Sequence, residues 1–458
     1  MSGPASATTI WDRTRLGITI GSVVLIFLAA TEALAVTTVM PVVSADLNGQ
    51  ALFAVAFSGT LATGVIGMVA AGAWSDRSGP RAPLYAAIGL FVVGLIVAGA
   101  AGNMLTFIVG RLIQGLGAGG QTVALYVVVA RVYPPDLHGR IFAAFAAAWV
   151  VPSMIGPFLA GAVAEFLHWR WAFLGVAVLT VLAFVLVASR LRRVSLDAPD
   201  TQGTTDGPGG PPIGRRMLLA LVVAAAAVSV GFAADAPPVI GWPLAVAAMA
   251  VLLVAIVPLL PRGTLRARPG LPSVILMRGL AAGAFFAAEA YVPKLLIEDF
   301  AFSPTVSGLA LTFSALAWSS ASAVQGRYGD RMGSRRIALI GIALVVVAVL
   351  GVLVVALTVS APWTVLFAWA FAGAGMGLLY PRLTVLTLAY STPANEGFNS
   401  SALSISDSTG SAVAIAVAGL GFVTLPLAGS GFVTVYVITG ALLVLSLLPG
   451  LRLGDGPR

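Results

Sequence analysis

Two stretches of this chain share one spacing of residues: Gly72-Ala-Trp-Ser-Asp-Arg-Ser-Gly-Pro-Arg81 and Gly326-Arg-Tyr-Gly-Asp-Arg-Met-Gly-Ser-Arg335. Glycine, aspartate, glycine and arginine fall at the same offsets in both. The first stretch follows the second apolar segment of the chain, and the other follows the second of the last six apolar segments. The recurrence indicates two related halves with the same helical arrangement, a plan known for secondary transporters.

The composition is that of an all-α integral membrane protein. Hydrophobic residues make up 59% of the 458 residues and charged residues only 9%, whereas a soluble domain has about 25% charged residues. The net charge of +8 does not indicate nucleic-acid binding, because the charges lie in short loops between apolar segments. The chain has no cysteine, which excludes disulfides and thiolate metal sites. We expect no cofactor and no metal.

Fourteen apolar segments have about the 20 residues that a membrane-spanning helix needs. We place them at residues 17–40, 52–74, 83–102, 104–130, 141–164, 170–190, 217–234, 239–260, 273–293, 303–325, 337–359, 362–389, 398–425 and 431–450. The first eleven residues lack the features of a removable signal peptide, so we expect the first segment to be retained.

The distribution of arginine predicts the orientation of these helices. Arginines gather in every second loop, from Arg13 and Arg15 through to Arg452, while the other loops hold only Arg170 and Lys294. Because basic residues favour the cytoplasmic side, both termini are predicted to be cytoplasmic in a multi-pass protein of a bacterial cytoplasmic membrane. Arg278 and Arg382 are interpreted as topogenic residues that reach the surface from helix ends.

The segments divide into four parts. We predict an N-terminal six-helix bundle at 1–194, a cytoplasmic linker rich in Asp, Thr, Gly and Pro at 195–215, an inserted transmembrane hairpin at 216–262, and a C-terminal six-helix bundle at 263–458. The hairpin carries no charge inside either helix. We therefore expect it to have a structural role, as a packing element and spacer that faces lipid.

Two acidic residues lie deep inside apolar segments, in the similar phrases Phe27-Leu-Ala-Ala-Thr-Glu32 and Phe285-Phe-Ala-Ala-Glu289. An ionisable group at the centre of a membrane span costs about 2.5 kcal/mol or more, which makes it a functional hypothesis. We predict that both carboxyls face one central cavity and couple proton movement to transport. Arg111 is the natural partner of Glu32, so we expect Glu289, which lacks such a partner, to hold its proton more readily.

Other polar residues in apolar segments are candidates for the same cavity. Gln114 and Gln121 share one helical face with Arg111. Asp407 is a third acid, on a stripe that includes Ser400, Ser404 and Ser411. We predict substrate contacts from Glu32, Gln114, Gln121, Trp149, Glu289, Ser404 and Asp407, and proton coupling by Glu32, Glu289, Asp407 and Arg111. No catalytic constellation or phosphate-binding loop occurs, so the chain is not expected to be an enzyme or ATP-driven.

The two repeated loops resemble the signature loop of the major facilitator superfamily, G-x-x-x-D-x-x-G-x-R. Arg111-Leu-Ile-Gln-Gly-Leu-Gly117 is similar to its helix-four motif, and Gly156-Pro-Phe-Leu-Ala-Gly161 to its antiporter signature. Glu32, nine residues before Pro41, resembles the acid of the 14-helix drug:proton antiporters, with Glu in place of Asp. The resemblance implies two pseudo-symmetric six-helix bundles with a two-helix insertion. It also implies gating roles for Gly72, Asp76, Gly79, Arg81, Asp330, Gly156, Pro157 and Gly161.

The implied function is proton-coupled export of amphipathic compounds, cationic or neutral and lipophilic, as in multidrug efflux and antibiotic resistance. The partners would be a small lipophilic substrate, protons and the lipid bilayer, without nucleic acid, and the protein would act as a monomer. A lipid or glycolipid exporter on the same fold is the first alternative. A nutrient:proton symporter is the second, and a receptor or membrane enzyme is the third.

Overall fold

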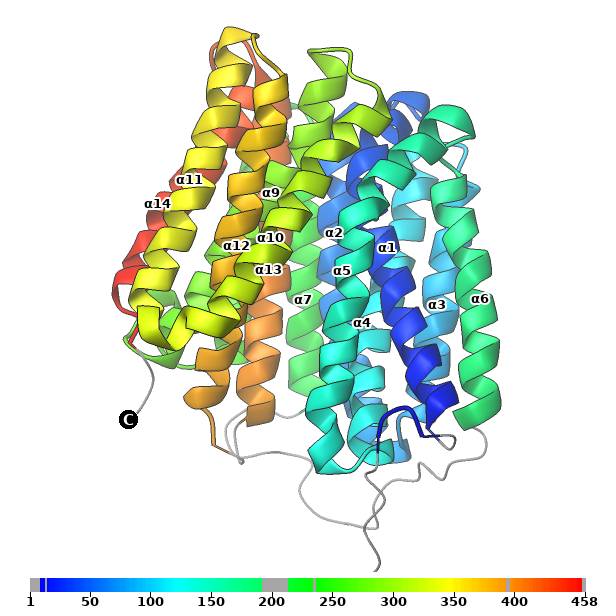
Figure 1. The fold of residues 1–458 in the computed structure, drawn as a ribbon. Coiled ribbons are helices and arrows are strands. Elements are labelled where there is room, and N and C mark those ends of the chain that lie inside the picture. Colours follow the sequence, from blue (N-terminus) through cyan, green and yellow to red (C-terminus); the bar gives the residue numbers. More distant parts are fainter. Residues whose placement is uncertain (1–8, 13–14, 192–212, 234–235, 393–395, 455–458) are drawn as a thin grey trace, which may run out of the picture.

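The computed structural model describes residues 9–12, 15–191, 213–233, 236–392 and 396–454. These residues form fourteen α-helices, joined by loops and a few single turns of 3₁₀-helix (Figure 1). The helices are α1 (Leu16–Asp46), α2 (Phe53–Ser78), α3 (Arg81–Gly99), α4 (Met104–Val132), α5 (Pro135–Phe166), α6 (Trp171–Leu191), α7 (Ile213–Phe232), α8 (Pro238–Ile256), α9 (Leu271–Glu298), α10 (Pro304–Met332), α11 (Ser334–Thr358), α12 (Trp363–Ala389), α13 (Glu396–Thr424) and α14 (Gly431–Leu451).

The predicted all-α membrane fold is confirmed. Thirteen helices of the described residues are long and apolar enough to cross a membrane. The fourteenth, α10, carries serines such as Ser314, Ser319 and Ser322, which lower its hydropathy and face a cavity described below. Helices dominate because lipid offers no hydrogen-bond partner, so each backbone group has to be satisfied within its own segment. Most of the predicted linker lies outside the described residues.

The two halves repeat the same packing. In the first half α4 packs against α2 and α3, while α1 packs against α5 and α6. In the second half α12 packs against α10 and α11, while α9 packs against α13 and α14. The contacts between the halves are also paired, because α5 packs on α10 and α2 packs on α13.

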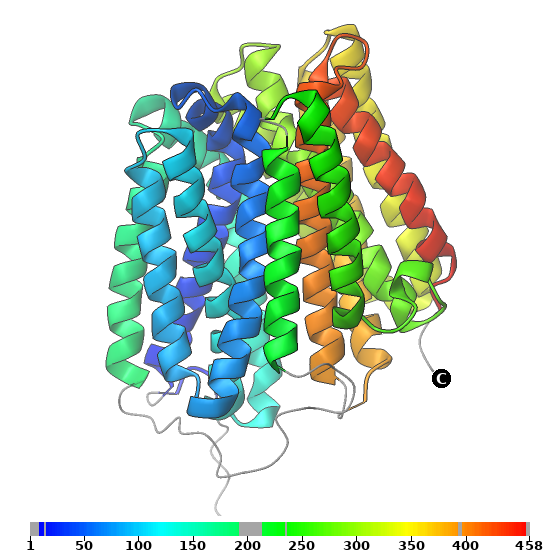
Figure 2. The ribbon, with the colours of Figure 1, turned by 180° about the vertical axis from the view of Figure 1, so that it is seen from behind.

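The inserted hairpin lies on the seam between the halves. Helix α7 packs along both α2 and α13, and α8 packs beside α7 on the side of the C-terminal half (Figure 2). Gly231 of α7 lies against Val55 of α2, where a Cβ atom would be only 2.9 Å from the valine side chain. Val239 and Val254 of α8 are 85% and 74% exposed. The hairpin therefore joins the halves through α7 and presents α8 to lipid.

The halves meet at the end of the bundle that is opposite the chain termini, which we call the closed end. Helix α10 lies beside α5 there and diverges from it toward the termini (Figure 1). Gly161 of α5 has no room for a Cβ atom, which would meet the carbonyl of Pro304 at the start of α10. A Cβ on Gly308 would lie 2.5 Å from the carbonyl oxygen of Pro157. On the other seam, a Cβ on Gly419 of α13 would collide with Ala54 of α2.

Close packing between α3 and α4 gives a test of these contacts. Gly94 and Gly89 both lie inside α3, but a Cβ on Gly94 would collide with the backbone of Gln114, whereas one on Gly89 meets nothing within 4 Å. Alanine favours a helix over glycine by about 1 kcal/mol at both sites, and overpacking costs about 1–3 kcal/mol. We expect Gly94→Ala to lower the midpoint of thermal unfolding in detergent and Gly89→Ala to preserve or raise it. Equal midpoints would contradict the packing of α3 on α4.

Candidate functional site

A cavity of about 640 Å³ lies between the two halves. Most of its wall comes from α9, α10 and α12 of the second half, and a smaller part comes from Trp149, Val150 and Ser153 of α5. Aromatic side chains form much of the surface, chiefly Phe285 and Trp318. Charged groups enter it at two places, Glu289 and the pair formed by Arg278 and Asp407. A mainly apolar chamber with a few charged groups is the usual form of a small-molecule site.

Glu289 is buried in this wall and is 8% exposed. Its Oε2 accepts a hydrogen bond of 3.2 Å from Nε1 of Trp369 on α12. The Trp369 ring stacks on Phe285, with ring centroids 5.6 Å apart. Among the described residues, no basic side chain forms an ion pair with Glu289. The carboxyl group therefore lies in an aromatic setting with no opposing charge.

Glu32, by contrast, is paired. Arg111 donates from Nη1 to Oε1 of Glu32 and, over 2.5 Å, to Oε1 of Gln114. The arginine also donates from Nε to the carbonyl oxygen of Ala56 over 3.2 Å. Glu32 and Arg111 are both nearly inaccessible, with exposures of 3% and 4%. The two side chains therefore neutralise each other inside the first half. Glu32 is not among the residues that line the cavity.

The two acids therefore occupy related positions with different partners. Glu32 on α1 faces Arg111 near the start of α4, and Glu289 on α9 faces Trp369 near the start of α12. An indole thus stands in the second half where a guanidinium stands in the first. The expectation that both carboxyls line one cavity is met by Glu289 alone in this structure.

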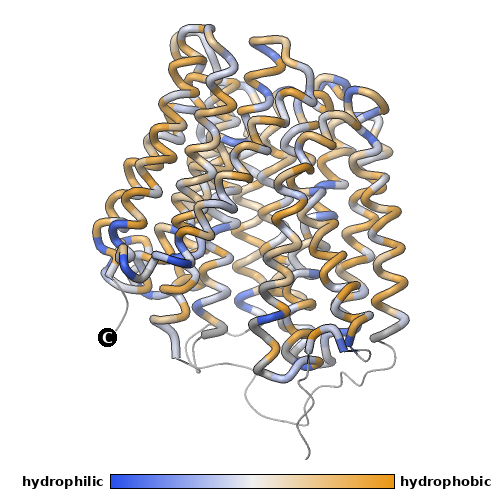
Figure 3. Tube along the Cα trace, viewed as in Figure 1, coloured by the Kyte–Doolittle hydropathy of each residue, from blue (hydrophilic) through white to orange (hydrophobic). Residues whose placement is uncertain are grey.

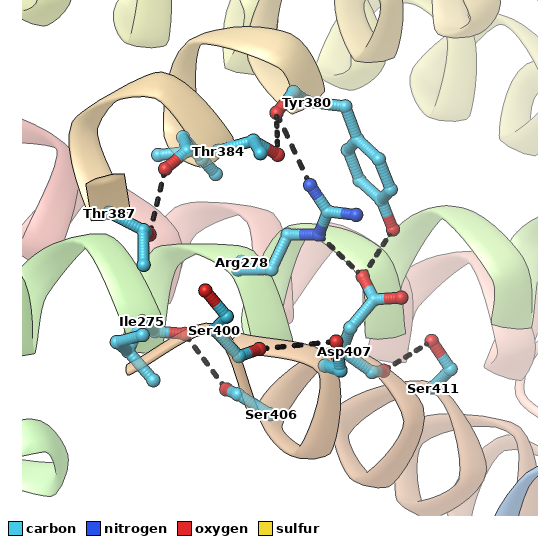
Figure 4. Close-up of polar contacts among 11 residues, drawn as sticks. Ile275, Arg278, Tyr380, Thr384, Thr387, Ser400, Ser406, Asp407 and Ser411 are labelled. Atoms are coloured by element: carbon cyan, nitrogen blue, oxygen red, sulfur yellow. Dashed lines mark hydrogen bonds and ion pairs between the residues drawn. The ribbon is translucent and has the colours of Figure 1, made fainter. Parts of the chain in front are cut away.

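The second charged group in the cavity is an ion pair, which corrects the prediction that Arg278 reaches the surface. Arg278 does not extend to the surface but points to Asp407 of α13, with Nε 2.7 Å from Oδ1 (Figure 4). The Tyr380 hydroxyl donates to the same oxygen over 2.6 Å, and the guanidinium carbon lies 3.3 Å from the centre of its ring. Arg382 is also buried, and its Nε donates to Oγ of Ser334. Neutralisation by Asp407 explains why Arg278 turns inward, and Arg382 is held inside the bundle by the Ser334 hydroxyl, so neither arginine follows the topogenic interpretation.

The sequence held a signal for Arg278. Phe285 and Glu289 follow it by seven and eleven residues on α9, which places all three on one helical face. Eleven residues span about 16 Å along a helix axis. The cavity is therefore elongated, with Glu289 toward the closed end, the Arg278–Asp407 pair toward the termini, and aromatic rings between them.

The other predicted binding residues divide into one that reaches the cavity and three that do not. Trp149 lines it and is 46% exposed. Gln114 is buried against Arg111, and Gln121 donates from Nε2 to the carbonyl oxygen of Leu25 over 3.3 Å. Ser404 is exposed and its hydroxyl donates to the carbonyl oxygen of Ser400. Of the predicted stripe formed by Ser400, Ser404, Asp407 and Ser411, only Asp407 lines the cavity.

The repeated loops share a backbone conformation. Gly79 ends α2 with φ of 81°, and Gly333 ends α10 with φ of 80°. In each case the glycine N–H donates to the last turn of its helix, at Ser75 or Gly329. A positive φ is easily adopted only by glycine, which explains the second glycine of both stretches. The side chains of Asp76 and Asp330 lie outside the described part of the chain.

Other gating candidates lie around these loops and at the closed end. Arg81 begins α3, and Gly72 lies beside Val123, where a Cβ atom would be accommodated at 3.6 Å. Pro157 and Gly161 lie in the contact between α5 and α10, whereas a Cβ on Gly156 would meet nothing within 4 Å. Close approach of the halves therefore depends on the last glycine of the motif rather than the first.

Polar contacts strengthen the closed end. The Thr305 hydroxyl donates to Oε2 of Glu165 over 2.6 Å, which links α10 to α5. Lys294 was assigned to a loop from the sequence, but it lies inside α9 and is 1% exposed. Its ammonium donates over 2.5 Å to Gln50 of the first half and to Glu298 of its own helix. Lys294 is therefore a buried charge at the contact between the halves.

Comparison with known proteins identifies the family. The model of the Major Facilitator Superfamily matches residues 22–292 and 274–457. An uncharacterized MFS-type transporter of Mycobacterium tuberculosis is 32% identical over 204 residues, which are 41% of this chain and 30% of that protein. The MFS-type transporter sphD of Aspergillus fumigatus is 31% identical over 188 residues, 39% of this chain and 31% of that protein. The chain thus aligns with about a third of the length of these relatives.

Solved structures support the same fold at low identity. An auto-inhibited POT family peptide transporter has a TM-score of 0.69 and 15% identity, covering 94% of this chain and 96% of its own. A D-xylose-proton symporter has a TM-score of 0.68 and 15% identity, covering 96% of this chain and 98% of its own. The family match extends over both halves, and it agrees with the repeated loops and the paired packing of the helices. The chain belongs to the major facilitator superfamily.

Proposed function

We propose that the chain exports amphipathic compounds, cationic or neutral and lipophilic, in exchange for protons. The observation that carries this proposal is Glu289, a buried carboxyl without an opposing charge in the wall of a cavity between the halves. A carboxyl in this position can hold either a proton or a cationic group of a substrate. Competition between the two for one site is sufficient to couple their movements in opposite directions.

The side to which the cavity opens follows, in this proposal, from the distribution of arginine. With the arginine-rich loops in a bacterial cytoplasm, the closed end faces outward and the cavity belongs to an inward-facing state. Substrate would then enter from the cytoplasm or the inner part of the bilayer. Outward opening requires α5 to separate from α10 and α2 from α13 at the closed end, while new contacts form near the termini.

The two acids have different roles in this proposal. Glu289 exchanges its proton in each cycle. Glu32 and Arg111 form a fixed pair that maintains the first half, because separating a buried ion pair leaves an uncompensated charge. The expectation that Glu289 holds its proton more readily than Glu32 remains part of this proposal, since Glu32 alone has a guanidinium partner.

The shape of the cavity favours an elongated substrate. Glu289 would contact a basic or polar group, and Phe285, Trp318 and Trp149 would contact apolar parts. Cations bind well over aromatic faces, which adds to the preference for lipophilic cations. A lipid or glycolipid exporter is the second candidate, because the wall is mainly apolar and a groove between the hairpin and the C-terminal half faces the bilayer.

Transport in liposomes tests the role of Glu289. Protein inserted with its arginine-rich side outward, with an acid interior, is expected to accumulate a fluorescent lipophilic cation. Glu289→Gln should lower the gradient-driven rate at least tenfold, because the amide can no longer exchange a proton. Glu32→Gln should also abolish transport, and its thermal unfolding midpoint should fall because Arg111 loses its partner.

Asp12→Asn, a change of an exposed acid outside the spans, is the matched control and should retain the wild-type rate. If Glu289→Gln keeps gradient-driven uptake, proton coupling by Glu289 is wrong, whatever Glu32→Gln does. If the dye is ignored while a fluorescent lipid moves, the lipid exporter is the correct interpretation.

A double-mutant cycle tests the pair of Arg278 and Asp407. Asp407→Asn leaves a guanidinium without its counter-charge, and Arg278→Gln leaves a carboxylate in the same state. Both single variants should lose dye transport and unfold at lower temperature. The double variant should be more stable than the sum of the two losses predicts, because contacting residues are not additive. Additive losses in the unfolding midpoint would show that the two side chains do not interact.

Cross-linking tests the movement of the closed end. The chain has no cysteine, so Glu165→Cys with Thr305→Cys introduces one defined pair of thiols on α5 and α10. Oxidation should join them and stop dye transport, and reduction should restore it, because the halves cannot then separate at this end. Each single cysteine variant is the control. Full transport by the quantitatively cross-linked protein would exclude opening between α5 and α10.

A further inference from the structure

A second hollow, of about 400 Å³, lies on the outside of the bundle. We call it the hairpin groove, because it runs between α8 of the hairpin and helices α9, α13 and α14 of the C-terminal half. Its walls include Leu253 of α8, Leu280 of α9, Val413 of α13 and Leu445 of α14. Ser406 also borders it, but its hydroxyl already donates to the carbonyl oxygen of Ile275 over 2.8 Å. The groove therefore offers apolar contact and little else.

The groove exists because α8 is held away from the bundle. Among the described helices, α8 packs closely on α7 but not on α9, α13 or α14. Behind it, α9 and α13 approach each other tightly, since a Cβ on Gly283 would lie 2.7 Å from the carbonyl oxygen of Gly410. The floor of the groove is thus closed, and Leu253 and Leu445, which are 47% and 52% exposed, stand at its open side.

An apolar groove within the membrane-spanning part of the protein is expected to hold apolar material rather than water. Apart from Leu260 and Leu265, its lining residues lie in membrane-spanning segments. Water gains no hydrogen bonds on such a surface, and an empty space loses the dispersion contacts of its walls. Acyl chains are the material that surrounds the helices here, and they are as apolar as the leucines of the wall.

A cluster of positive charge lies at the end of the groove nearest the chain termini. Leu265, a groove residue, is followed by Arg266 in the loop that joins α8 to α9, and Arg262 and Arg268 lie in the same loop. Arg452, at the end of α14, is the fourth member. All four are exposed, and hydrophilic residues gather at this corner beside the C-terminus (Figure 3). Residues 257–270 and 445–454 contain no acid.

The loop that carries this cluster is held in a defined shape. Arg452 donates from Nη1 to the carbonyl oxygens of Arg266 and Ala267, over 3.0 and 2.8 Å. The Ser273 hydroxyl donates to the carbonyl oxygen of Arg268 over 2.7 Å. Gly263 has φ of 89°, which bends the chain back so that Arg268 lies against it. The arginines are therefore placed beside the groove by a fixed backbone.

We propose that the hairpin groove binds an acyl chain of an anionic phospholipid whose phosphate is bound by Arg262, Arg266 and Arg268. One guanidinium group can donate two parallel hydrogen bonds to two oxygens of a phosphate. Basic pockets between transmembrane helices are suited to anionic headgroups. The positive charge of the arginines favours an anionic headgroup over one without net charge. The depth of the groove adds contacts with an acyl chain, which a site confined to the membrane surface would lack. The site is separate from the central cavity and does not depend on the proposed transport activity.

Native mass spectrometry of the full chain in detergent tests this site. The probes are phosphatidylglycerol and phosphatidylcholine with identical acyl chains, added at equal concentrations. The wild type should retain phosphatidylglycerol in preference. Arg266→Gln with Arg268→Gln should weaken that binding about thirty-fold, since each basic residue contributes about fivefold near a membrane surface. Arg140→Gln, an exposed arginine at the same end of the N-terminal half, should leave it unchanged.

A second pair of variants tests the acyl chain itself. Leu253→Trp fills the groove from α8 and should displace the lipid while all four arginines remain. Leu244→Trp, on the same helix at a 40% exposed position that does not line the groove, should have no effect. Equal retention of both lipids by the wild type would overturn the proposal, and so would undiminished binding in Leu253→Trp. Loss of dye transport with intact lipid binding would count against the proposed export function alone.

Discussion

Charge neutralisation in a medium without water governs the interior of this protein. Glu32 is matched by Arg111, Asp407 by Arg278, and Lys294 by Glu298 together with the amide of Gln50. Each pairing joins two helices or two turns of one helix, so the charges also fix how the helices lie. Glu289 departs from this pattern among the described acids inside the spans, since it meets only an indole N–H. The exception draws attention because an unpaired carboxyl can become neutral only by taking a proton.

The sequence predicted most of the fold because two independent patterns agreed. Apolar segment lengths placed fourteen helices, and each observed helix overlaps its predicted segment, although α1, α5, α9 and α10 extend further than predicted. The repeated loops then predicted two halves, which the repeated packing confirms. These signals are strong because the bilayer imposes helix length and the positive-φ glycines impose the loop shape.

The interior of the site was harder to predict because sequence position does not give depth or direction. Arg278 and Lys294 were read as surface residues from their distance to the ends of apolar segments, yet both are turned toward partners inside the bundle. Lys294 has long-range contacts with Gln50, which is 244 residues away, and no local spacing encodes such a contact. The contact between Arg111 and Glu32 was easier to predict, because each is a buried charge that needs an opposite charge nearby.

The position of α7 has a consequence for how the two halves can separate. The seam between α2 and α13 is covered by a helix that packs on both, whereas the seam between α5 and α10 carries no such cover among the described helices. The two seams therefore differ, because one is covered by the hairpin and the other faces the bilayer directly. In the proposed cycle, separation of α2 from α13 would also have to break the contacts of α7 with one of these two helices, whereas α5 and α10 can separate without disturbing the hairpin.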